Sequence, residues 1–490
     1  MDNTNNKINP KFKIPEEIIS LDIDALGPNI SEEAKKIIVL QHNIIGQIYS
    51  AYQDLLEDHQ KLRDEVNRLK GEKGKPEIKP NVPRKENDIT PDPTKEHKDW
   101  EKKSKKANIK IDKVEVVQID KSVLPPDAIF KGYDEVIKQG IIFKANNILY
   151  KLECYYSPSE KKTYAAKLPN ALQGTEFDSD LKAFIANLYY KGRVTEHKIK
   201  SILEEAGISI SEGEISNILT KEKQSEFTNE KQDIFEAGME HSEHIHADDS
   251  GARHKGINHH VHVVCNALFT AFFITRFKNK KEIRQILGLK ENEQLSKVLL
   301  TDDAKQYYYL AIFHALCWIH EIRPYRKLNP FLDWHREKLN HFLTEIWKFY
   351  EMLREYKKNP DEKQKEFLER KFDELFSTKT GYEELDRRIE LTKKQKEKLL
   401  LVLTHPKIPL HNNPAEIALR EMVIKRNISG GTRSENGKIA WENMMSIMDT
   451  CRKMKVSFFD YVKDIFSGEH KMTRLSDLII QKSLQNSAHH

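Results

Sequence analysis

Apolar residues recur every seven positions in one stretch near the start of the chain. Two series run between residues 31 and 70: Ile38, Ile45, Tyr52, His59 and Val66, and then Ile48, Leu55, Leu62 and Leu69. Charged residues surround them, and a repeat of this kind predicts a coiled coil between helices of two chains. An amphipathic helix packed on its own domain is the alternative, and His59 at a core position would weaken a coil.

The composition changes after this repeat. Residues 1–30 are polar, and residues 71–113 combine several prolines and mixed charges with few aliphatic side chains, which predicts an irregular N-terminus and a disordered linker. Residues 114–175 predict a small β-rich module, with strand-like runs at 141–143 and 148–152.

Residues 176–236 predict three short helices. Thr195 begins the second, which ends before Gly207, and the capping box Ser211-Glu212-Gly213-Glu214 begins the third. A glycine turn before the last helix is typical of a helix-turn-helix unit, whose last helix, about 212–220, could enter a DNA major groove. A plain helical connector fits the same pattern.

From residue 237 the pattern becomes strand-like. Strands are expected at 244–247, 261–268, 271–275, 297–301 and 312–318, and helices at 280–287 and from 305. This order is that of a ribonuclease H-like mixed sheet, in which the first and fourth strands are neighbours. We therefore assign residues 237–330 and 405–468 to one α/β domain, with a helical insertion at 331–404 and a tail at 469–490.

Acidic residues follow two of these strands. We expect the first strand to end at Asp248-Asp249 before a Ser-Gly turn, and Asp302-Asp303 to follow the fourth. Glu416 lies on a helix that begins within residues 411–414. Three carboxylates can hold the two Mg²⁺ or Mn²⁺ ions that phosphodiester chemistry uses. Successive residues of a strand face opposite sides, so one of each doublet is the ligand, and we assign Asp248, Asp302 and Glu416.

Other polar residues are candidates for supporting roles. Asp249 and Asp303 would support the metal ligands without binding the metal themselves. Arg420, four residues after Glu416, would orient that carboxylate or hold a phosphate. A glycine-containing basic loop would let cations reach DNA phosphates. The candidate DNA-binding residues there are Lys425, Arg426, Arg433 and Lys438.

Histidines and cysteines suggest two further kinds of site. The spacing of His244 and His246 would suit zinc, but solvated or DNA-facing histidines are favoured because no cysteine pair accompanies them. Cys317 and His320 could form a nucleophilic couple, although a core cysteine with a capping histidine fits the pattern better.

Overall composition narrows the class of protein. The formal net charge of +5, from 81 basic and 76 acidic residues, is a weak indication of nucleic-acid binding. Four scattered cysteines argue against a disulfide framework and fit a reducing cytoplasm. We see no signal peptide and no apolar run of about 18 residues, so no membrane span is expected.

These motifs resemble those of the insertion sequence 66 family of transposases. The blocks are 246–251, 301–303, 316–323 and 411–416 with its continuation through 420–433. The resemblance implies a DDE transposase: a ribonuclease H-like core, a helical insertion before the last carboxylate, Mg²⁺ dependence and 3′-OH strand transfer at the ends of an element. The family's triad falls on Asp248, Asp302 and Glu416.

The resemblance also implies partners. These are the terminal inverted repeats of a bacterial element, target DNA, helper proteins encoded by the element, and a second copy bound through the coiled coil; a cytoplasmic, nucleoid-associated location follows. The chain departs from the family at His411, Ile417 and Asp303, and a single cysteine, Cys154, stands where members often carry a zinc module. A DNA-binding or dimerising protein without catalysis, or a structure-specific nuclease, are the alternative functions.

Overall fold

The computed structural model describes residues 14–26, 30–69, 111–119, 128–168 and 176–488. The predicted linker lies outside these ranges except for residues 111–113. Internal contacts divide the chain into two units, residues 1–52 with 144–490 and residues 53–143. No helix among the described residues is long and apolar enough to cross a membrane.

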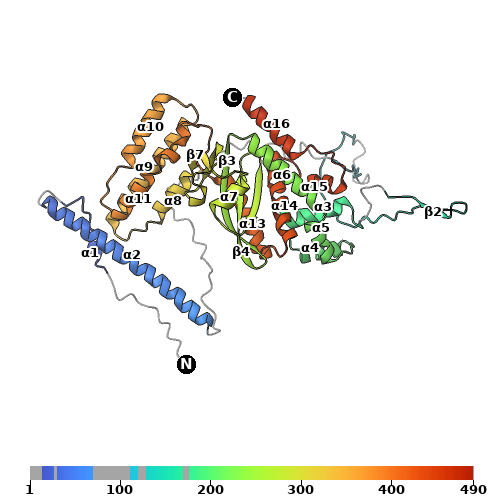
Figure 1. Cartoon of the computed structure of the whole chain (residues 1–490), viewed down its shortest axis with the longest axis horizontal. Coiled ribbons are helices and arrows are strands. Elements are labelled where there is room, and N and C mark those ends of the chain that lie inside the picture. Colours follow the sequence, from blue (N-terminus) through green and yellow to red (C-terminus); the bar gives the residue numbers. More distant parts are fainter. Residues whose placement is uncertain (1–13, 27–29, 70–110, 120–127, 169–175, 489–490) are drawn as a thin grey trace. The chain divides into compact units, whose positions relative to one another are not determined.

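A five-stranded mixed sheet lies at the centre of the larger unit (Figure 1). In spatial order its strands are β5 (Thr270–Thr275), β4 (Ile257–Cys265), β3 (His244–His254), β6 (Leu295–Thr301) and β7 (Ala311–Leu316). The first three are antiparallel neighbours, whereas β3–β6 and β6–β7 are parallel. The first and fourth strands of the domain are thus adjacent, as the ribonuclease H-like order predicts.

Helices precede, interrupt and follow the sheet (Figure 1). Before it come α1 (Glu16–Ile19), α2 (Glu32–Leu69), α3 (Ser179–Ala186) with the π-helical turn η3 (Asn187–Lys191), α4 (Glu196–Glu205), α5 (Glu212–Thr220) and α6 (Gln224–Glu240). Within and after it come α7 (Lys280–Ile286), η4 (Lys305–Tyr307), α8 (Trp318–Lys327), α9 (Asp333–Tyr356), α10 (Glu362–Leu375), α11 (Glu383–Lys393), α12 (Lys396–Leu399) and η5 (Leu401–Leu403). The last are α13 (Asn413–Ser429), α14 (Glu435–Met454), α15 (Phe458–Ser467) and α16 (Leu475–Ala488).

Two hydrophobic cores meet at the central strands. One contains Leu299 and joins the sheet to α3–α7 and α13–α16. The other contains Val298 and Leu300 and joins β6 and β7 to α8–α12. Successive residues of β6 therefore serve different cores, which explains why this parallel strand is apolar without alternation.

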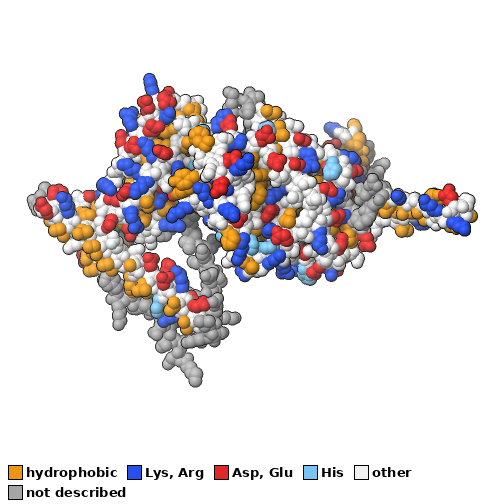
Figure 2. Space-filling model, viewed as in Figure 1, with side chains coloured by type: hydrophobic (Ala, Val, Ile, Leu, Met, Phe, Trp, Pro, Cys, Tyr) orange, Lys and Arg blue, Asp and Glu red, His pale blue; other side chains and the backbone are white. Residues whose placement is uncertain are grey.

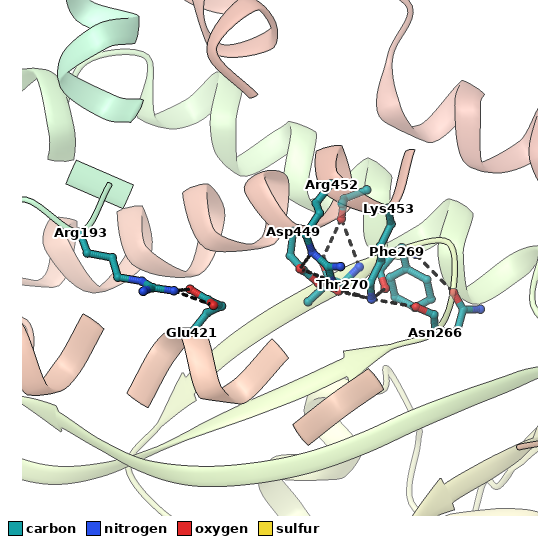
Figure 3. A network of polar contacts seen from close by, with 9 residues as sticks. Arg193, Asn266, Phe269, Thr270, Glu421, Asp449, Arg452 and Lys453 are labelled. Atoms are coloured by element: carbon teal, nitrogen blue, oxygen red, sulfur yellow. Dashed lines mark hydrogen bonds and ion pairs between the residues drawn. The ribbon is translucent and has the colours of Figure 1, made fainter. Parts of the chain in front are cut away.

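Polar contacts attach α13 and α14 to their surroundings (Figure 3). At the end of α14, Lys453 donates from Nζ to the carbonyl oxygens of Asn266 and Phe269 at 2.7 and 2.8 Å, and so fixes the turn before β5. Arg193 donates from Nη2 to both carboxylate oxygens of Glu421, at 2.8 and 2.5 Å. The second contact joins α13 to the segment between η3 and α4.

The first strand of the sheet is longer than predicted. We expected it to end at the acidic doublet before a Ser-Gly turn, but β3 continues to His254. Asp249, Ser250 and Gly251 keep their antiparallel partners on β4, and the chain turns only at 255–256. Ladder pairing with β4 overrides the local turn preference of Ser and Gly, so the carboxylates lie within the strand. The helix expected from residue 305 is also only the short turn η4.

A small antiparallel sheet precedes the three-helix region, as predicted, but at other residues. Its strands are β1 (Cys154–Ser157) and β2 (Lys162–Ala165), joined at a turn that contains Lys161 with φ of 49°. The predicted strands at 141–143 and 148–152 are not strands in the structure. Their aliphatic side chains are largely exposed, so they gain none of the burial that would stabilise a ladder.

The predicted helices on either side of the linker are present. The third helix of the 176–236 region, α5, begins at Ser211, whose Oγ accepts a hydrogen bond from the N–H of Glu214 at 3.1 Å. In α2, the first part packs on the insertion: Asn43 donates to the Gly381 carbonyl at 2.9 Å, and Tyr49 stacks on Phe331. Part of the heptad helix is therefore already covered within its own chain.

Candidate active site

The parallel pair of β3 and β6 brings two of the predicted ligands to one edge of the sheet. The last paired residues are His246 and Leu300. Asp248 and Asp302 each come two residues after that pair, in the same register. Asp302 accepts a hydrogen bond from the N–H of Ala304 at 3.3 Å, which holds the start of the following loop.

Asn412 positions the third carboxylate. Its side chain is fully buried at the start of α13, where Nδ2 donates to the Ala247 carbonyl at 3.1 Å and Oδ1 lies 2.9 Å from His246 Nδ1. Its backbone N–H donates to Cys317 Sγ at 3.2 Å. These bonds hold the first turn of α13, which contains Glu416, against the residue before Asp248. The motif around Asn412 therefore clamps the helix to β3 as well as starting it.

The three carboxylates influence one another electrostatically. Burial, followed by the negative charges of neighbouring carboxylates that include Asp302 and Glu416, raises the pKa of Asp248 to about 7. Burial is also the main cause that raises the pKa of Asp302. Carboxylates gathered and desolvated in this way are stabilised by a cation placed among them.

Helix α8 adds two basic side chains whose contact with Glu416 the sequence did not indicate. Arg323 Nη2 lies 3.0 and 3.2 Å from the carboxylate oxygens of Glu416, and Arg323 Nη1 lies 2.8 Å from His320 Nε2. His320 Nδ1 is 3.4 Å from Glu416 Oε1. Because a guanidinium only donates, Nε2 of His320 accepts and its proton lies on Nδ1, facing the carboxylate. The available signal was a histidine and an arginine three residues apart in the helix that follows β7.

The second residues of the acidic doublets face elsewhere. Asp249, with only 5% of its side chain exposed, is 2.9 Å from Lys278 Nζ and accepts from Gln306 Nε2 at 2.9 Å. Asp303 accepts from Gln395 Nε2 at 3.1 Å and so contacts the insertion rather than the triad. Strand alternation predicted this separation for Asp249.

Arg420 is not the cation on Glu416. Its side chain is exposed, and among the described residues the ion-pair partners of Glu416 are Arg323 and His320. The expected pairing within one helix was wrong because α8 presents a guanidinium at closer range.

Lys425 is not on a DNA-facing surface. Only 1% of it is exposed; Nζ donates to the Tyr189 carbonyl at 2.5 Å and lies 3.1 Å from the centre of the Tyr189 ring. Burial lowers the pKa of Lys425 to about 7, against the opposing charge of Glu196. The prediction that this lysine binds DNA was therefore wrong, and its contacts join α13 to η3.

The other basic residues of the loop remain near the surface. Arg426 donates to the Gly251 carbonyl of β3, Arg433 is exposed, and Lys438 lies 2.5 Å from Glu435. The adjacent Gly431 has φ of 105°, and a Cβ there would lie 2.3 Å from the Arg253 carbonyl oxygen. This glycine is thus explained by close packing on β3, independently of any phosphate.

Carboxylate oxygens suit hard divalent cations such as Mg²⁺ and Mn²⁺, whereas a cysteine-histidine-glutamate group suits Zn²⁺. Among the described residues, Cys317, His320 and Glu416 are the group of possible ligands whose atoms all lie within 4.8 Å of one another, and the carboxylate triad is more widely spread. Two ions ~3.5–4 Å apart, each ~2.1 Å from its ligands, allow outer oxygens to be separated by up to roughly 8 Å. Among the described residues, His244 and His246 belong to no group of three or more such ligands, which disfavours the zinc interpretation of this pair.

Comparison with known proteins identifies a family for this chain. Residues 174–440 match the family described as transposase IS66, a range that includes Asp248, Asp302 and Glu416. An uncharacterised protein of Sinorhizobium fredii, y4jO, is 38% identical over 167 residues, which make up 34% of this chain and 51% of that protein. The chain thus spans about half the length of that curated relative. With more than half of its length matched, the chain belongs to the transposase IS66 family.

Proposed function

We propose that this protein is a DNA transposase that cleaves the ends of a bacterial insertion sequence and joins the freed 3′-OH to target DNA. The observation that carries the proposal is the convergence of carboxylates from β3, from the end of β6 and from the first turn of α13, with the pKa of Asp248 raised to about 7. Family membership supports the same class of reaction.

A different structural feature holds each carboxylate of the triad in place. Asp248 is fixed by pairing of its strand with β4, Asp302 follows a buried strand, and Glu416 is held by the Asn412 clamp. Asp248, Asp302 and Glu416 would hold two Mg²⁺ or Mn²⁺ ions. When bound, such ions activate the attacking oxygen and stabilise the leaving oxygen of a phosphodiester.

We further propose that the protein acts as a dimer through α2. Several large apolar side chains on this helix are exposed, and Figure 2 shows hydrophobic side chains along its length. They are Ile37, Leu40, Ile44, Ile48, Leu55, Leu62 and Val66. Their spacings of three, four and seven place them on one helix face, which a second copy of the same helix would cover.

The test is strand transfer with the purified full-length chain, Mg²⁺ and DNA that carries the inverted repeats flanking its gene. Asp302→Asn should abolish both cleavage and joining, because an amide cannot replace a charged metal ligand. Asp303→Asn is the matched control, since the adjacent side chain contacts the insertion. Equal activity of Asp302→Asn and wild type would refute the site. Cleavage without joining would instead indicate a nuclease, and DNA binding without any product a non-catalytic protein.

A further inference from the structure

Arg323 is the cation in closest contact with the proposed site. Its side chain is 48% exposed, whereas that of Glu416 is 23% exposed. A single nitrogen, Nη2, lies between both carboxylate oxygens of Glu416, at 3.0 and 3.2 Å. It occupies the position from which a metal ion would bind both oxygens.

We propose that Arg323 is an exchangeable counter-ion: Glu416 holds it until a divalent cation binds, and the released guanidinium then binds a phosphate of the DNA. The inference rests on the proposed function, because it takes Glu416 as a metal ligand. It adds that metal binding and DNA binding are coupled through one side chain.

Electrostatic repulsion and solvent exposure favour the release of Arg323 from Glu416 when a divalent cation binds. A divalent cation on Glu416 would repel a guanidinium at the same oxygens and compete with it for their lone pairs. Ion pairs that reach solvent contribute little to stability, and the half-exposed Arg323 can therefore leave this contact at a small cost. His320, the other partner of Arg323, is a neutral acceptor and offers a weaker hold than a carboxylate.

Lys278 shows what a fixed cation looks like at the same site. Its partner Asp249 is nearly buried and is also held by Gln306 Nε2, so that pair is fixed in the neighbourhood of Asp302. Arg323 has no comparable restraint, and its planar fork matches two oxygens of a phosphate better than an ammonium does.

The first experiment measures Mn²⁺ affinity of the full-length chain without DNA, by titration calorimetry. Arg323→Gln should bind Mn²⁺ about two- to fivefold more tightly than wild type, because the competing ion pair is gone. Arg323→Lys keeps a competing charge and should stay nearer wild type. Arg420→Gln is the matched control. It removes the same positive charge from α13, one turn after Glu416, at a side chain that does not pair with Glu416. It should change the Mn²⁺ affinity less than Arg323→Gln does. Unchanged or weaker Mn²⁺ binding by Arg323→Gln would overturn the proposal.

The second experiment measures binding of a short fluorescent DNA duplex of arbitrary sequence, with and without Ca²⁺. Without Ca²⁺, wild type and Arg323→Gln should bind alike, since Glu416 retains the guanidinium. Ca²⁺ should strengthen binding more for wild type than for Arg323→Gln, and Arg323→Lys should show an intermediate gain. An equal gain in all three proteins would overturn the coupling. Failure of the proposed function would show separately, as unchanged Mn²⁺ affinity in Glu416→Gln.

Discussion

At the scale of single residues, the site depends on side chains whose roles are set by distant partners. The neighbouring sequence indicates only that Asn412 begins a helix, yet its side chain joins β3 to α13 through Ala247 and His246. Lys425 belongs to a basic run, yet it is buried against Tyr189 and Tyr190, and Glu196 is the charge that opposes its loss of a proton. In both cases the contact partner lies more than 150 residues away in the sequence.

The buried lysine predicts a pH dependence of stability. The pKa of Lys425 falls from its ordinary 10.5 to about 7 on folding. The unfolded chain therefore binds more protons between these values, and the contribution of Lys425 to stability rises with pH in that window, by up to about 1.4 kcal/mol per pH unit. Lys425→Met lacks this gain. Its free energy of unfolding, measured by urea denaturation, should fall further behind wild type as pH rises from about 7.5 to about 9.5.

A control separates this effect from the loss of packing. Lys281 lies on α7 with an exposed side chain, so the difference between Lys281→Met and wild type should be flat with pH. A flat difference for Lys425→Met as well would show that this lysine stays charged in the folded protein.

At the scale of elements, α2 has two different environments. Near its start, Asn43 and Gln47 bond to the insertion, with Gln47 Nε2 2.9 Å from Glu383. Further along, Leu55 is 66% exposed and Leu62 is 70% exposed. Side chains of this size in a continuous stripe predict an interface, since their burial contributes on the order of 1.5–3 kcal/mol each.

The stripe gives a direct test of the dimer. Leu55→Glu combined with Leu62→Glu should convert a dimer to a monomer in light scattering, because four like charges would face one another across the seam. The monomer should keep its helical circular dichroism, as these side chains have little to lose within one chain. Gln53→Glu adds the same charge two positions from Leu55 and should leave the dimer intact. A wild-type monomer, or a double variant that still dimerises, would contradict the assignment.

The helices and strands show what sequence patterns can and cannot predict. Apolar runs located the five strands of the sheet, and their order predicted that β3 and β6 are neighbours, which in turn placed Asp248 and Asp302 together. The predicted end of β3 was wrong because pairing with β4, which the local sequence does not reveal, continues the strand past Ser250 and Gly251. The strand predicted at 141–143 does not form, since apolar composition alone supplies no pairing partner.

At the scale of the whole molecule, the larger unit places its site where its two cores meet. Leu299 and Leu300, adjacent on β6, belong to different cores, and Asp302 comes two residues after Leu300. One core orients α13 with Glu416, and the other orients α8 with Arg323. Sequence could predict the carboxylates, which lie on or beside recognisable strands and at the start of a helix. It could not predict the Arg323–Glu416 contact, because that contact joins two helices separated by the entire insertion.

The central claim is that Asp248, Asp302 and Glu416 form one metal site, and Mn²⁺ titration of the full-length chain tests it most directly. Asp248→Asn, Asp302→Asn and Glu416→Gln should each lose at least about tenfold in Mn²⁺ affinity, since each removes a charged oxygen ligand. Asp303→Asn should bind Mn²⁺ like wild type. If the three triad variants bind Mn²⁺ as tightly as Asp303→Asn does, these carboxylates do not share a metal site.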